Sequence, residues 1–69
     1  MPDSVNFKTA QALKDEGNIQ FRQKDYGSAH RSYEKAIAAL QGEKETAETR
    51  RLHAILASNS SACMFCLKQ

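Results

Sequence analysis

Lys14 and Asn18 are the first residues of this chain whose types and spacing suggest chemistry. They stand one helical turn apart in a strongly helical segment, so both side chains lie on one face of the helix. The lysine ammonium and the asparagine amide both donate hydrogen bonds, and together they suit an anionic oxygen. A polar pair displayed on a helix favours a binding surface rather than an active site.

Both residues also have a plain structural interpretation. A single lysine on a helix is usually a solvated surface residue. Asparagine is a poor helix former that prefers caps, so Asn18 either contacts a ligand or hydrogen-bonds a neighbouring helix. Asn59 poses the same question, because it interrupts an otherwise apolar stripe later in the chain and could link two helices.

Cys63 and Cys66 form a C-x-x-C motif, a spacing found in zinc sites and redox dithiols. A zinc site needs four ligands, and neither His30 nor His53 stands at a finger-like spacing from the pair. A redox motif needs its first cysteine at a helix start after a strand, whereas this pair lies late in a helical pattern. We therefore expect reduced cysteines that pack as small apolar residues, no metal, and a reducing compartment.

No pattern in the chain indicates catalysis. His53 has no nearby nucleophile, and the adjacent carboxylates of Asp15 and Glu16 diverge by about 100° on a helix. There is no glycine-rich phosphate loop, so we expect a protein that is not an enzyme and uses no cofactor. Ten Lys and Arg against eight Asp and Glu are too balanced to indicate nucleic-acid binding. A solvated basic edge, which could also help to bind an acidic peptide, is expected from Arg22, Lys24, His30 and Arg31.

Two helices must position Lys14 and Asn18. We expect the first to begin after one of three possible caps and to end near Lys24. The second should run from Tyr26 to Leu40, with Asp25 as its N-cap. Gly42 stands just past its end, where a left-handed residue is common. The three possible caps of the first helix are Asp3, Ser4 and Asn6.

A third helix must carry Asn59. Residues 43–51 are charged and are either a loop or the solvated start of this helix, with Thr46 as a plausible cap. The helical pattern then continues from Leu52 almost to Gln69. No alternating run or hairpin turn predicts a strand, so the fold class is all-α.

The expected core consists of stripes at helical spacing. Gly17 should destabilise its helix by about 1 kcal/mol relative to alanine, which indicates that a second helix approaches closely there. Ala29 and Ala36 offer that helix a face of small residues. The stripes comprise Ala10, Leu13, Gly17 and Phe21, then Tyr26, Ala29, Tyr33, Ala36, Ile37 and Leu40, and finally Leu52, Ile55, Leu56, Ala62, Cys63, Cys66 and Leu67.

The third helix looks like the first helix of a second repeat. Shifting the chain so that Asn59 falls on Asn18 also lays Ser58 on Gly17, a small residue on a small one. An alternative shift pairs Phe65 with Phe21 but loses the asparagine match.

These residues resemble the tetratricopeptide repeat family, whose unit is a 34-residue pair of antiparallel helices. The resemblance covers about Ala10 to Gln69 and implies about one and a half repeats. Residues 1–9 would be an N-terminal extension, 10–42 the first hairpin, 43–51 a charged connection and 52–69 the first helix of a truncated second repeat. The family's packing positions match Leu13, Gly17, Phe21, Tyr26, Ala29, Tyr33 and Ala36.

Within that family the chain looks most like the carboxylate-clamp co-chaperones, including the myosin-directed and mitochondrial-import ones. Their Lys-x-x-x-Asn pattern matches Lys14–Asn18, and their Ser-Asn-x-Ser/Ala-Ala pattern matches Ser58–Ala62. The resemblance implies that Lys14, Asn18 and Asn59 bind the carboxylates of a peptide. The implied partners are the C-terminal tails of the 70 and 90 kDa heat-shock chaperones, ending in Glu-Glu-Val-Asp, and the implied location is cytoplasmic. The family's two other clamp residues, a lysine and an arginine, would lie beyond Gln69.

A different interpretation is a scaffold or oligomerisation segment that uses apolar helix faces and recognises no carboxylate. No run approaches the roughly 18 apolar residues of a membrane span. Met64, Phe65 and Leu67 would be partly without partners on the third helix. We expect an N-terminal piece of a longer co-chaperone that could self-associate through that helix.

Overall fold

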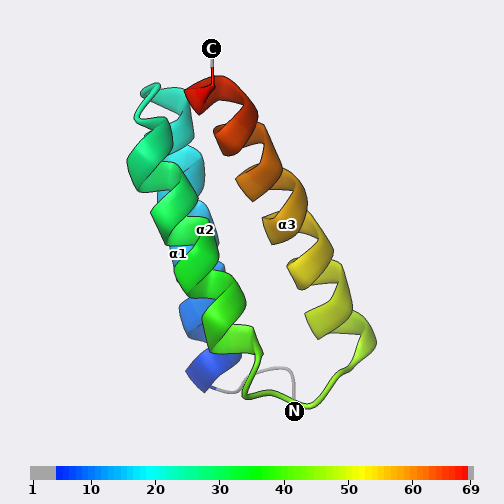
Figure 1. Cartoon of the computed structure of the whole chain (residues 1–69). Coiled ribbons are helices and arrows are strands. Elements are labelled where there is room, and N and C mark those ends of the chain that lie inside the picture. The colour runs from blue at the N-terminus through cyan, green and yellow to red at the C-terminus, as the bar shows by residue number, and fades with distance from the viewer. Residues whose placement is uncertain (1–4, 69) are drawn as a thin grey trace.

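The computed structural model describes residues 5–68, which form three helices and no strand. They are α1 (Val5–Arg22), α2 (Tyr26–Leu40) and α3 (Ala47–Leu67). α1 and α2 form an antiparallel hairpin, and α3 runs back along α2 in the direction of α1 (Figure 1). α2 packs against both other helices, whereas α1 and α3 meet at few residues. The predicted all-α hairpin with a third helix is confirmed.

α1 ends at Arg22, close to the predicted end near Lys24, and the turn that follows contains a left-handed residue that the sequence did not predict. Lys24 takes a left-handed conformation with φ 65°. Its N–H donates to the carbonyl of Phe21 at 3.0 Å, and the N–H of Asp25 donates to the carbonyl of Gln20 at 2.9 Å. These two bonds form a Schellman motif, which satisfies carbonyls that the helix end leaves without partners.

The prediction of a left-handed conformation at Gly42 is wrong, because no glycine within residues 5–68 has a positive φ. α2 ends at Leu40 with Gln41 as its C-cap, whose φ of −65° and ψ of −21° are right-handed. The chain then runs on through a connection long enough to need no sharp reversal. Asn6 lies inside α1 and therefore does not cap it, while Asp3 and Ser4 lie outside the described residues.

α2 and α3 both begin at the caps predicted for them. Asp25 Oδ1 accepts the N–H of Ser28 at 3.4 Å, which confirms it as the N-cap of α2. Thr46 Oγ1 accepts the N–H of Thr49 at 3.2 Å, and Thr49 Oγ1 accepts the N–H of Thr46 at 2.7 Å. This reciprocal capping box starts α3 at Ala47. The charged segment 43–51 is therefore part loop and part helix, and the third helix begins before Leu52.

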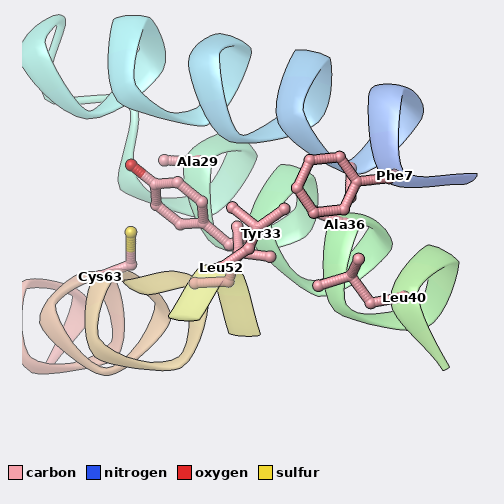
Figure 2. Close-up of a cluster of buried hydrophobic side chains, with 9 residues drawn as sticks. Phe7, Ala29, Tyr33, Ala36, Leu40, Leu52 and Cys63 are labelled. Carbon is pink, nitrogen blue, oxygen red and sulfur yellow. The ribbon is translucent and has the colours of Figure 1, made fainter. Parts of the chain in front are cut away.

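The core forms where the three helices face one another (Figure 2). Two corrections concern its composition: Phe7 is buried although no predicted stripe included it, and Ile55, Ala62 and Leu67 are exposed. Around the core, Ser32 Oγ on α2 donates to Gln20 Oε1 on α1 at 2.7 Å. The buried apolar residues are Phe7, Ala10, Ala29, Tyr33, Ala36, Leu40, Leu52, Leu56 and Cys63.

Gly17 marks the close approach of α1 and α2, and its partner is a large residue. A Cβ at Gly17 would lie 2.6 Å from Cε1 of Tyr33 and 2.8 Å from Cδ1. The Tyr33 side chain is 1 % exposed, so the ring has little room to move away. The expected facing residues, Ala29 and Ala36, are buried, but the aromatic ring of Tyr33 fills the space that Gly17 leaves.

Gly17→Ala is therefore expected to destabilise the chain by about 1–3 kcal/mol, since overpacking outweighs the better helix propensity of alanine. Gly27→Ala is the matched control, because nothing lies within 4 Å of a Cβ built at this other helical glycine. It should be neutral or stabilise by up to about 1 kcal/mol. Urea denaturation followed by circular dichroism measures both, and a Gly17→Ala variant as stable as Gly27→Ala would contradict the assigned contact.

Candidate functional site

Asn18 and Asn59 meet at one point, although they come from α1 and α3 and lie far apart in the sequence. Asn59 Nδ2 donates to Asn18 Oδ1 at 3.4 Å. The hydroxyl of Tyr33, on α2 between them, donates to the same oxygen at 2.6 Å. One carbonyl oxygen on α1 thus links all three helices.

A groove of about 370 Å³ opens beside this contact. Its polar groups come from the two asparagines, Arg22 and the tyrosine hydroxyl, while Phe21 and Ala62 form apolar walls. The exposure of Ala62, which the apolar stripe did not predict, is explained by its place in this wall. The lining residues are Asn18, Phe21, Arg22, Tyr33, Asn59 and Ala62.

The amide groups retain donors that a ligand could use. Both hydrogen bonds to Asn18 end on its Oδ1, and no hydrogen bond among residues 5–68 uses its Nδ2. Asn59 Nδ2 gives one N–H to Asn18 and also hydrogen-bonds Tyr33, so the unused donors are those of Asn18. Fixed amide donors beside a cation suit a carboxylate or a carbonyl oxygen, and they add direction without burying another charge.

Lys14 lies on α1 one turn before Asn18 and is half-buried. It is not among the residues that line the groove. The structure therefore brings Asn18 and Asn59 together and leaves Lys14 beside them. Arg22 does line the groove; the sequence predicted it on a solvated basic edge that could also help to bind an acidic peptide. Its position one turn after Asn18, in the direction opposite to Lys14, is the signal that could have identified it.

Burial keeps the groups under the groove protonated. It raises the pKa of Tyr33, as does the neighbouring Cys63, while a hydrogen bond from Asn59 acts in the opposite sense. Burial also raises the pKa of the Cys63 thiol, with a further contribution from Cys66. Tyr33 therefore keeps the proton that it donates to Asn18, and Cys63 is poorly suited to be a nucleophile or a metal ligand.

The two cysteines and the other polar side chains of residues 5–68 do not form a second binding or catalytic site. Cys63 is buried in the core, as predicted, and Cys66 is half-buried, with both thiols free. Within residues 5–68 no cluster of three His, Cys, Asp or Glu side chains is arranged to hold a metal. In the same range no helix is long and apolar enough to cross a membrane. A hollow of about 410 Å³ beside the α2–α3 connection has both acidic and basic walls, including Glu43, Glu45 and Arg50.

The chain has no match among protein-family models, curated proteins or solved structures.

The raised pKa values of Tyr33 and Cys63 predict a loss of stability in alkaline solution. The fold favours their protonated forms, so each contribution is complete below the group's ordinary pKa, which is 10.0 for Tyr33 and 9.0 for Cys63, and is lost as the pH rises through the higher folded value. The free energy of unfolding should fall above about pH 9, which urea titrations at pH 7, 9 and 10.5 would measure.

Tyr33→Phe provides the comparison for this alkaline transition. It should be less stable at pH 7 by about 1 kcal/mol, because it lacks the hydrogen bond to Asn18. Between pH 9 and 10.5 it should lose less stability than the native chain. An equally steep loss in Tyr33→Phe would show that Tyr33 does not contribute to the transition.

Proposed function

We propose that this chain is a tetratricopeptide-repeat segment of a co-chaperone and a protein-interaction module. It binds the acidic C-terminal peptide of the 70 and 90 kDa heat-shock chaperones through a partial carboxylate clamp of Lys14, Asn18 and Asn59. The convergence of Asn18 and Asn59 at a groove with spare amide donors is the observation that supports it most.

The chemistry of the ligand matches these groups. A terminal aspartate carries two negative charges close together, on its side chain and on its main-chain carboxylate. Lys14 would supply a positive charge at one end, and the two asparagines would donate to carboxylate oxygens. Hydrogen bonds to charged groups are each worth about 1.5–3 kcal/mol, so a few such contacts suffice for measurable binding.

The arrangement of the helices supports the family assignment. Asn59 on α3 is the counterpart of Asn18 on α1 under the shift that best aligns the two segments, and α3 runs in the same direction as α1 (Figure 1). A glycine facing a large aromatic residue across the hairpin, as Gly17 faces Tyr33, agrees with the family's alternation of small and large packing residues.

The clamp is expected to bind weakly in these 69 residues, because two cations of the family's pattern have no counterpart in them. Weak binding to a dianion should also depend strongly on salt, because screening at high ionic strength reduces the attraction between exposed charges. Nuclear magnetic resonance titration suits this range of affinity and reports on each amide separately.

The test is a titration of the 69-residue chain with a peptide ending in Glu-Glu-Val-Asp, and with the same peptide carrying a C-terminal amide. The free carboxylate should be preferred, with the largest shifts at Asn18 and Asn59. Lys14→Ala and Asn59→Ala should each weaken binding by about tenfold. Lys35→Ala is the matched control, since Lys35 is exposed on the side of α2 opposite Tyr33 and should leave binding unchanged. Equal binding of acid and amide, or no effect of Lys14→Ala, would reject the clamp.

The alternative, an oligomerisation segment, is favoured by the apolar end of α3. Met64, Phe65 and Leu67 are 47 %, 58 % and 55 % exposed. A chain that associates through this end should form dimers in sedimentation experiments as its concentration rises, with little dependence on salt. Phe65→Glu should then return it to a monomer. A native chain that stays monomeric at every concentration would reject this alternative.

A further inference from the structure

Arg22 is the cationic residue of the groove lining, and its guanidinium has no ion-pair partner within the described part of the chain. None of the residues that line the groove is acidic. No carboxylate of residues 5–68 forms a salt bridge with Arg22. The guanidinium is exposed, so a ligand in the groove can reach it without displacing an internal partner.

We infer that Arg22 determines specificity by selecting ligands with an acidic side chain two or three residues before their C-terminal residue. This inference rests on the proposed function, which places the terminal carboxylates of the ligand at Lys14, Asn18 and Asn59. In this role Arg22 contacts a side chain that precedes the C-terminal residue of the ligand, whereas the clamp binds the C-terminal residue itself.

Helix geometry relates Arg22 to the clamp residues. A stripe on α1 consists of Lys14, Asn18 and Arg22, which follow one another at intervals of four residues. Four residues correspond to about 400° of rotation about the helix axis, so each side chain points only about 40° away from the one before it. The three side chains therefore form one gently winding stripe along α1. With a rise of about 1.5 Å per residue, Arg22 begins about 6 Å beyond Asn18 and about 12 Å beyond Lys14.

The spacing of an extended peptide matches this stripe. A strand-like chain advances about 3.3 Å per residue, so 6 Å corresponds to about two residues and 12 Å to between three and four. A ligand whose terminal carboxylate lies between Lys14 and Asn18 would place its second or third preceding side chain beside Arg22. The Phe21 and Ala62 walls of the groove would contact the residue in between.

Arg22 also has a role that needs no ligand. It lies in the last turn of α1, where a cation interacts favourably with the helix dipole. Any cation serves that purpose, and it produces no selectivity between peptides. The decisive measurement is therefore the ratio of two peptide affinities, which a purely structural role of Arg22 would leave unchanged.

The experiment compares a peptide ending in Glu-Glu-Val-Asp with one ending in Gln-Gln-Val-Asp, each titrated into the 69-residue chain at low salt. The native chain should prefer the Glu-Glu peptide by about threefold to fivefold, the range of an exposed ion pair. Arg22→Gln should bind both peptides equally, with its affinity for the Gln-Gln peptide unchanged. Arg22→Lys should keep most of the preference. Arg31→Gln is the matched control for lost charge, since Arg31 is exposed on the side of α2 away from Tyr33.

The outcomes separate the inference from the proposed function. If Arg22→Gln keeps the native preference while both peptides still require their free C-terminal carboxylate, the inference is overturned and the clamp stands. If the amidated peptide binds as well as the acid, or no peptide binds, the clamp fails and the inference fails with it. Melting temperatures of Arg22→Gln and Arg22→Lys, measured in parallel, verify that α1 remains folded.

Discussion

The contact between Gly17 and the ring of Tyr33 is the constraint on which the three-helix arrangement depends. Only a residue without a Cβ lets α1 approach α2 this closely, since a Cβ would lie 2.6 Å from the ring. The ring extends from α2 towards α1 and lies near Cys63 of α3 (Figure 2). A single aromatic side chain on the central helix therefore limits how closely α1 can approach and lies next to α3 as well.

The hydroxyl of the same ring organises the polar groups of the groove. It donates to Asn18 Oδ1, and the side chain of Asn59 donates to the same oxygen. The two interpretations of the asparagines are therefore compatible, because an amide has an acceptor end and a donor end. The acceptor of Asn18 holds the helices together, and its donors remain for a ligand. A groove held by the core in this way keeps its donors in place before any ligand binds.

Local features of the fold were predictable, and the exceptions have local causes. The bounds of α2 and the caps Asp25 and Thr46 follow from side-chain chemistry within a few residues, so the sequence sufficed for them. The left-handed residue at Lys24 was missed because lysine pays a steric penalty there that glycine does not. The short turn between two helices demands that conformation at this position, whereas the longer connection after α2 makes no such demand on Gly42.

The sequence alone determined which residues share a face of each helix, and it predicted that Asn18 and Asn59 occupy equivalent positions of two repeats. Only the tertiary structure decided what each face meets. It placed Tyr33 opposite Gly17, and it brought Arg22 into the groove while leaving Lys14 outside its lining. The reason is physical: helical periodicity fixes the direction of a side chain about its own axis. The space in front of that side chain depends on how closely the neighbouring helices approach and on what they carry.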